Sequence, residues 1–165
     1  MSQHRYLIAL GSNQRHPHFG MPREVLRVAA EILDETLGTV VGLSPIVETA
    51  PVGPSLRRYA NAALMLDSHL PPAGLLACLQ AAEAAFGRRR LGQRWRSRVL
   101  DLDIVLWSGG TFQASNLAIP HPLFRERDFV LGPAARIAPD WRDPETGLSL
   151  RQLHARLTRN GPAPR

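Results

Sequence analysis

Two aspartates, Asp101 and Asp103, have the residue type and spacing to bind a metal ion. Leu100, Leu102 and Ile104 alternate with them, which is the pattern of a strand with one face in the core. Residues i and i+2 lie roughly 6.5 Å apart on one face of a strand. Both carboxylates can therefore reach one hard cation or a close pair of cations, which indicates a magnesium platform.

The segment before the aspartates supplies positive charge. It contains six arginines, namely Arg88, Arg89, Arg90, Arg94, Arg96 and Arg98. Magnesium binds few protein carboxylates and takes its other oxygens from water and substrate phosphates, and arginine is well suited to phosphate recognition. The combination favours a polyphosphate ligand. An edge strand that exposes its charges after a solvated basic loop would have the same sequence.

The composition is that of a globular protein. The 165 residues are 44 % hydrophobic and 21 % charged, which predicts a single domain over 1–165 with a frayed tail at 159–165. No apolar run approaches the ~18 residues of a membrane span, and the chain starts with a strand pattern instead of a signal peptide. A cytoplasmic protein without membrane contact is expected, and the single cysteine, Cys78, cannot form an internal disulfide.

The charge balance raises nucleic acid as a partner. The net charge is +6, and all 20 Lys and Arg residues are arginine. A basic chain of this kind can bind nucleic acid, but the aromatic content is only 6 % and no RNA- or DNA-binding motif is visible. A small phosphorylated ligand and no nucleic-acid partner are expected.

The elements that must position the aspartates follow from hydrophobic periodicity. Strand patterns cover 5–10, 39–47, 59–66 and 100–106, and helical patterns cover 22–38, 72–86, 129–137 and 148–157. This order predicts an α+β fold, a ferredoxin-like βαββαβ sheet with helices packed on one face. The last two helices would form an added C-terminal region.

Four motifs occur in order along the chain. They are Ile8 to Asn13; Glu48 and Thr49 with Pro51 to Gly53 and Tyr59 to Asn61; Arg98 to Asp103; and Ile119 to Pro122 with Arg127 and Phe129. Together they resemble the 6-hydroxymethyl-7,8-dihydropterin pyrophosphokinase family of folate biosynthesis, over nearly the whole chain. The resemblance implies transfer of a pyrophosphoryl group from ATP to the hydroxymethyl group of the pterin, with release of AMP.

The resemblance also implies a role for each matching position. The catalytic residues would be Asp101, Asp103, Arg88, Arg98 and His121. The pterin would be bound by Thr49, Ala50, Val52, Tyr59, Asn61, Trp95 and Phe129. ATP would be bound by Gln80, Glu83, Arg88, Arg90, Arg98, Ile104, His121 and Arg127. The two aspartates would hold two Mg²⁺ ions when ATP is bound, and the enzyme would be a monomer.

Several positions depart from the family pattern. Val47 replaces a commonly aromatic position, and the chain from Gln14 onward lacks the usual Leu-Gly-Asp continuation. Arg96 stands where a small residue is usual. Asn116 and Ala118 are short where some relatives carry a basic residue and a threonine near the nucleotide. These differences concern ATP affinity and not the reaction.

Two other functions are compatible with the same residues. An arginine-rich nucleic-acid-binding module would use the basic segment on a phosphate backbone, which Asp101 and Asp103 would repel. Another magnesium-dependent nucleotidyl or phosphoryl transferase would use the two aspartates differently. The products separate the three hypotheses: AMP with pyrophosphorylated pterin, no turnover, or pyrophosphate or ADP.

Overall fold

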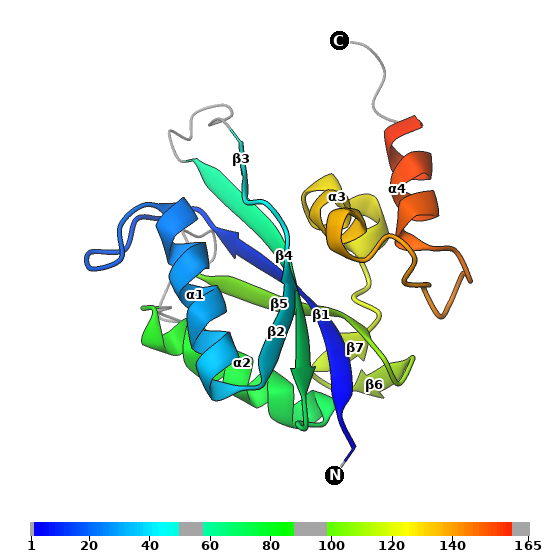
Figure 1. Ribbon diagram of the computed structural model, residues 1–165, viewed down its shortest axis with the longest axis horizontal. Coiled ribbons are helices and arrows are strands. Elements are labelled where there is room, and N and C mark those ends of the chain that lie inside the picture. Colours follow the sequence, from blue (N-terminus) through cyan, green and yellow to red (C-terminus); the bar gives the residue numbers. More distant parts are fainter. Residues whose placement is uncertain (1, 50–57, 88–98, 160–165) are drawn as a thin grey trace.

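The computed structural model describes residues 2–49, 58–87 and 99–159, and its centre is an antiparallel sheet with the strand order β2-β4-β1-β5 (Figure 1). The strands of this sheet are β1 (His4–Ser12), β2 (Thr39–Leu43), β3 (Val47–Thr49), which pairs with β4, β4 (Tyr59–Ser68) and β5 (Asp101–Trp107). The helices are α1 (Pro22–Thr36), α2 (Pro72–Ala85), α3 (Asp128–Ile137) and α4 (Leu150–Arg159). Apart from the short β3, this is the element and strand order of a ferredoxin-like unit, so the predicted α+β class is confirmed.

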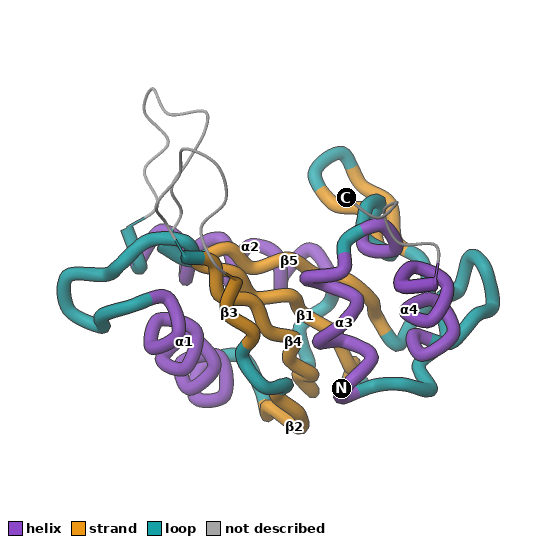
Figure 2. Tube along the Cα trace, turned by 90° about the horizontal axis from the view of Figure 1, so that it is seen from above, coloured by secondary structure: helices purple, strands orange, loops and turns teal. Residues whose placement is uncertain are grey.

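Helices cover both faces of the sheet. One core joins α1 and α2 to the strands and includes the buried side chains of Ile8, Leu26 and Leu75. A second core joins α3 and α4 to the opposite face and includes Leu131 and Leu150. Figure 2 shows α1 on one side of the strands and α3 and α4 on the other. The sequence placed the first two helices correctly on a common face but predicted no position for the last two.

The connection from α1 to β2 passes very close to the end of β4. Pro22 begins α1, where its fixed φ suits the first helical position and its missing N–H is not needed. After the helix ends, Gly38 lies against the backbone of β4, and a Cβ at this position would overlap the carbonyl oxygen of Asp67. The glycine is therefore required by a close approach of two backbone segments.

The strand predicted over 39–47 is wrong in length, because it is divided into β2 and β3. Pro45 follows β2 and has no N–H to give to a ladder. Ser44 keeps the contact with β4 at this point, since its N–H donates to the Ala63 carbonyl at 2.9 Å and its Oγ accepts a 2.9 Å hydrogen bond from the N–H of Ala63. The division allows β3 to start again at Val47 and to pair with the opening residues of β4.

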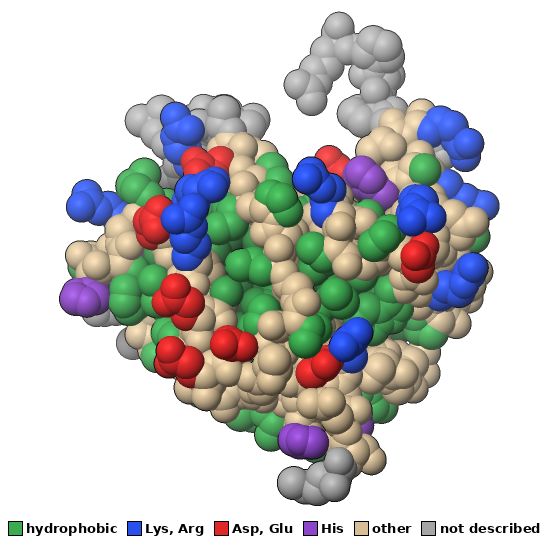
Figure 3. All heavy atoms as spheres, in the orientation of Figure 1, with side chains coloured by type: hydrophobic (Ala, Val, Ile, Leu, Met, Phe, Trp, Pro, Cys, Tyr) green, Lys and Arg blue, Asp and Glu red, His purple; other side chains and the backbone are tan. Residues whose placement is uncertain are grey.

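The surface of α1 mixes charges of both signs. Arg27 lies 3.7 Å from Glu24, and Arg23 lies 3.4 Å from Glu48 of β3. Figure 3 shows acidic and basic side chains next to one another over this helix. The arginines of α1 therefore form no continuous basic surface. In the part of the chain that the structure describes, no helix has the length and apolar character needed to cross a membrane.

Candidate active site

Strand β5 presents both aspartates on the face opposite Leu102. Leu102 is buried with α1 and α2, whereas Asp101 and Asp103 are half-buried. Val105, which follows on the aspartate side, is buried in the core formed with α3 and α4. The prediction of a strand with only one face in the core is therefore wrong at Val105. The C-terminal helices cover this face and leave the aspartate end of the strand more accessible.

A pocket of about 610 Å³ opens at the aspartate end of the sheet. Its described lining consists of Gly11, Ser12, Asn13, Thr49, Tyr59, Asn61, Asp101, Arg127 and Phe129. Of the residues predicted to bind the pterin, the structure brings together Thr49, Tyr59, Asn61 and Phe129. Tyr59 and Phe129 are 40 % and 49 % exposed, so two aromatic side chains from separate elements are available to a ligand.

The last two residues of β1 and Asn13, which follows them, line the site but were not assigned to it from the sequence. Gly11 pairs with Asn61 across β1 and β4, and a Cβ on Gly11 would lie 3.2 Å from Nδ2 of Asn61. Gly11 thus leaves room for the Asn61 amide, while Ser12 and Asn13 line the same pocket. The available signal was the Gly-Ser-Asn sequence at the end of a buried strand. It has the composition of a turn, although Gly11 and Ser12 are still part of β1, and polar segments at strand ends often carry function.

A second pocket, of about 290 Å³, lies on the Asp103 side of the site. Its lining includes Asp103, Ile104, His121 and residues 113–118 of a hairpin. The hairpin consists of β6 (Phe112–Ala114) and β7 (Leu117–Ile119). Asp101 lines the first pocket and Asp103 lines the second. The aspartate pair therefore connects the two pockets.

His121 lies within the electrostatic field of both aspartates and of Arg127. Partial burial lowers the pKa of His121 below its ordinary value and Arg127 acts in the same direction, while Asp103 and Asp101 oppose the shift without reversing it. The Nδ1 atom accepts a 3.1 Å hydrogen bond from the N–H of Leu123. In the neutral ring the proton is then on Nε2, which can donate to a ligand in the second pocket.

Three residues predicted to bind ATP have placements that the sequence did not indicate. Glu83 is only 3 % exposed, and its Oε2 accepts a 2.8 Å hydrogen bond from the N–H of Leu102. Glu83 therefore supports the backbone between the two aspartates. Gln80 is exposed on α2, and neither it nor Glu83 is among the described residues that line the two pockets. Arg127 lines the first pocket instead of the second.

The other predicted site residues lie outside the described residues. These are Ala50, Val52, Arg88, Arg90, Trp95 and Arg98. Their assignments stay predictions.

The aspartate pair fits a magnesium ion bound together with a phosphate. Within residues 2–49, 58–87 and 99–159, no three or more His, Cys, Asp or Glu side chains gather into a metal cage. Mg²⁺ does not need such a cage, because it retains several waters and uses one or two carboxylates with substrate phosphates. Asp101 and Asp103 provide two neighbouring carboxylates of this kind.

An acidic pair between two pockets suits an enzyme that brings two small substrates together at a metal ion. The family model described as "7,8-dihydro-6-hydroxymethylpterin-pyrophosphokinase (HPPK)" matches residues 7–139. The chain belongs to this family, as the four motifs predicted.

Relatives in several bacteria share the name 2-amino-4-hydroxy-6-hydroxymethyldihydropteridine pyrophosphokinase. The Pseudomonas aeruginosa protein is 39 % identical over 153 residues, covering 92 % of this chain and 90 % of the relative. The Methylorubrum extorquens protein is 40 % identical over 138 residues, covering 82 % and 84 %. The Synechocystis protein is 44 % identical over 101 residues, which are 61 % of this chain and 51 % of the relative. The match thus spans about half the length of the Synechocystis protein.

The fold is also found in solved structures. Wild-type Plasmodium falciparum HPPK-DHPS with pteroate superimposes with a TM-score of 0.74 at 13 % identity, covering 94 % of this chain and 42 % of that chain. The wild-type structure of the same protein described without a ligand gives the same TM-score. At this identity the likeness supports the fold alone.

Proposed function

We propose that the protein transfers a pyrophosphoryl group from ATP to the hydroxymethyl group of 6-hydroxymethyl-7,8-dihydropterin and releases AMP, as a step in tetrahydrofolate biosynthesis. One observation carries the proposal beyond family membership. Asp101 and Asp103 connect a pocket that has two aromatic side chains and an amide with a second pocket that has a histidine. Two substrates bound in these pockets would meet at the carboxylates.

The first pocket is suited to a flat, polar-edged ring system. Tyr59 and Phe129 would cover the two faces of the ring, which is a favourable environment for a heterocycle. The Asn61 amide offers both a donor and an acceptor to the ring edge. Thr49, at the end of β3, lies on the same side as part of the lining. Ala50, Val52 and Trp95 remain part of this proposal as predicted pterin contacts.

The second pocket is proposed to take the triphosphate side of ATP. Nε2–H of His121 would donate a hydrogen bond to a phosphate oxygen, and Ile104 would contribute to the nucleotide side. Phosphoryl transfer depends mainly on alignment of the reacting groups and on stabilisation of charge on the phosphate oxygens. Arg88, Arg90 and Arg98 are proposed to supply further positive charge, as the family pattern implies.

Asp101 and Asp103 are proposed to hold Mg²⁺, with two ions when ATP is bound. Magnesium bound there would neutralise charge on the phosphate oxygens and lower the pKa of the pterin hydroxyl. The carboxylates themselves would set the distance between the two substrates, because one lines each pocket. The two acids therefore have a positioning role as well as an electrostatic one.

We also propose that the enzyme acts as a monomer in the cytoplasm, without nucleic acid or membrane as a partner. The monomeric state is what the family resemblance implies. ATP and a reduced pterin would be the only binding partners.

The test is an assay with ATP, Mg²⁺ and reduced hydroxymethylpterin in which nucleotide products are separated. AMP formed in equal amount to pyrophosphorylated pterin is the expected result. A reduced pterin that lacks the hydroxymethyl group serves as the control and should give no AMP. Formation of ADP or pyrophosphate would favour a different transferase. If no product forms from ATP, the proposed reaction of these substrates is refuted.

A further inference from the structure

The segment from His121 to Phe129 carries three residues of the proposed site on a short turn. The 3₁₀-helix η1 (Phe124–Glu126) lies between His121 and Arg127. Backbone hydrogen bonds join Phe124 N–H to the carbonyl of His121 at 3.3 Å and Arg127 N–H to the carbonyl of Phe124 at 3.4 Å. The positions of His121 and Arg127 therefore both depend on η1.

Two ion pairs of Arg125 join η1 to the loop between α3 and α4: one to Glu145, whose Oε2 lies 3.2 Å from Nη2, and a shorter, two-point one to the buried Asp143. Nε of Arg125 donates to Oδ2 of Asp143 at 2.6 Å, and Nη2 donates to Oδ1 at 2.8 Å. The Asp143 side chain is 0 % exposed and that of Arg125 is 24 % exposed. A two-point contact of this kind fixes orientation as well as distance.

The loop is organised around Asp143 itself. Besides Arg125, the carboxylate accepts hydrogen bonds from Oγ1 of Thr146 at 2.7 Å and from the N–H of Glu145 at 3.0 Å. The Asp143 backbone also bonds Gly147 and Leu148, each at 2.8 Å. Asp143 is thus held by hydrogen bonds to four residues of its own loop, which makes it a rigid anchor.

The charge of the anchor is stabilised in the folded protein. Burial by itself would raise the pKa of Asp143, but the hydrogen bonds from Arg125, Thr146 and the Glu145 N–H outweigh it and hold the pKa below its ordinary value. The same contact raises the pKa of Arg125. Both side chains are therefore charged at neutral pH.

We infer that Arg125 and Asp143 are positioning residues, which orient η1 so that His121 and Arg127 face the two pockets. The inference rests on the proposed function, because it assigns those two residues to substrate contacts. Neither Arg125 nor Asp143 lines a pocket, so each would act only through the turn. A misplacement of about 1 Å in a reacting constellation can cost ~100-fold in rate.

The chain contains a matched control for this ion pair. Arg5 and Asp67 form the same two-point contact, with Nε–Oδ1 and Nη2–Oδ2 distances of 2.7 and 2.9 Å. They lie directly opposite one another on β1 and β4, where the backbone ladder already holds the strands. Loss of this pair should change stability without moving a residue of the site.

The experiment compares Arg125→Lys and Asp143→Asn with Arg5→Lys and Asp67→Asn. For each variant, kcat, both KM values and thermal unfolding are measured, with kinetics well below the unfolding temperature. We expect the first two variants to lose about 10- to 100-fold in kcat/KM, and the double variant Arg125→Lys/Asp143→Asn to be little worse than the poorer single one. The kcat/KM values of the two control variants should stay within about twofold of those of the wild type.

Thr146→Val gives a milder perturbation, because it removes one bond to Asp143 and leaves the ion pair in place. It should show a smaller loss of kcat/KM in the same direction, and it decides the matter if the ion-pair variants do not fold. Lowered unfolding temperatures with kinetic constants equal to those of the controls would overturn the positioning role and leave the proposed function intact. A wild-type protein that forms no AMP would overturn the proposed function, and with it this inference.

Discussion

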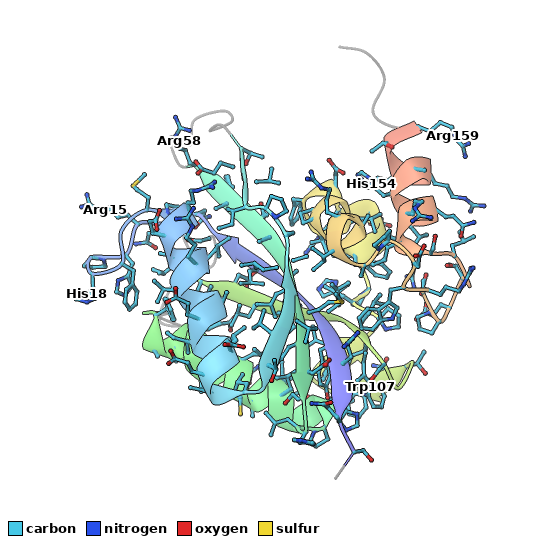
Figure 4. The ribbon with its side chains drawn as sticks, viewed as in Figure 1. Arg15, His18, Arg58, Trp107, His154 and Arg159 are labelled. Atoms are coloured by element: carbon cyan, nitrogen blue, oxygen red, sulfur yellow. The ribbon has the colours of Figure 1, made fainter. Side chains whose placement is uncertain are left out.

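The two ends of strands β1, β4 and β5 have opposite characters. Arg58, just before β4, and Trp107, at the end of β5, mark these two ends in Figure 4. At the Trp107 end, Tyr6 is fully buried and its hydroxyl donates to the Leu70 carbonyl at 2.6 Å. Nε1 of Trp107 donates to Nδ1 of His4 at 3.1 Å. At the other end, the same strands place Asn61 and Asp101 around the larger pocket.

The difference shows how one sheet separates stability from binding. At the Trp107 end, the polar atoms of Tyr6 and Trp107 are paired within the protein, which favours folding. At the pocket end, carboxylate, amide and aromatic groups face a cavity, an arrangement that favours ligands and adds less to stability. Substitutions at the two ends should therefore have separable effects on turnover and on the free energy of unfolding.

The largest effect is expected from removing a charge at the pocket end. Asp103→Asn or Asp101→Asn should reduce turnover by about 1000-fold or more, because the substituted residue no longer offers a carboxylate to Mg²⁺ and the phosphates. The free energy of unfolding should change by less than about 1 kcal/mol, since both side chains lie outside the two cores. AMP formation and urea unfolding measure the two effects, and wild-type turnover in either variant would contradict the separation.

A backbone contact at the Trp107 end should give the opposite result. Gly38→Ala would push a Cβ into the Asp67 carbonyl, and we expect a loss of about 3 kcal/mol in stability because backbone cannot move aside easily. At a temperature where the variant is folded, kcat should equal that of wild type. Gly74→Ala is the control, since its nearest contact is 3.6 Å away. A kcat that falls in Gly38→Ala but not in Gly74→Ala would show that the two ends are coupled.

The Asn61 amide provides a test of which substrate binds in the larger pocket. Asn61→Ala should weaken pterin binding about tenfold, or ~1.4 kcal/mol, and leave the affinity for an unreactive ATP analogue unchanged. Gly11→Ala should act in the same direction with a smaller effect, because the new Cβ would press on Nδ2 of Asn61 at 3.2 Å. Calorimetry with each ligand measures both, and equal losses for the two ligands would refute the assignment.

The smallest effect is expected at Tyr6. Burial raises the pKa of Tyr6 from 10.0 to about 12. The folded state therefore keeps a proton that the unfolded chain loses near pH 10, so this stabilisation is complete below that pH and disappears as the pH rises toward 12. Tyr6→Phe should lose about 1 kcal/mol at neutral pH, keep wild-type turnover and show a weaker decline in alkaline solution. Urea unfolding between neutral and alkaline pH measures the free energy of unfolding of both proteins. If it falls as steeply with rising pH in Tyr6→Phe as in the wild type, burial of the phenol is contradicted.

Patterns within a single element predicted most of the framework. The apolar stripe after Pro22 marked α1, and the alternation around Asp101 and Asp103 placed both carboxylates on one face of β5. These predictions succeeded because side-chain direction along a helix or strand depends only on the local backbone period.

Predictions that required knowledge of distant segments were incomplete or wrong. Val105 is buried because α3 and α4 cover its face of the sheet. The apolar run from Ile104 to Trp107 is compatible with burial on both faces, but it does not indicate which segments cover the second face. Glutamate on a helix is usually exposed, yet the Glu83 side chain is buried. It accepts a hydrogen bond from the N–H of Leu102, 19 residues further along the chain, which would otherwise lack an acceptor.

The sequence by itself determined the α+β class, the family, and the pairing of two acids with a phosphate-binding type of site, because these are carried by local periods and by ordered motifs. Only the tertiary structure decided that Asp101 and Asp103 line different pockets and that Arg127 faces the pocket of Tyr59 and Asn61. It also decided that a buried carboxylate 18 residues after Arg125 holds the turn between His121 and Arg127. Such contacts depend on how separate elements pack, which no local pattern encodes.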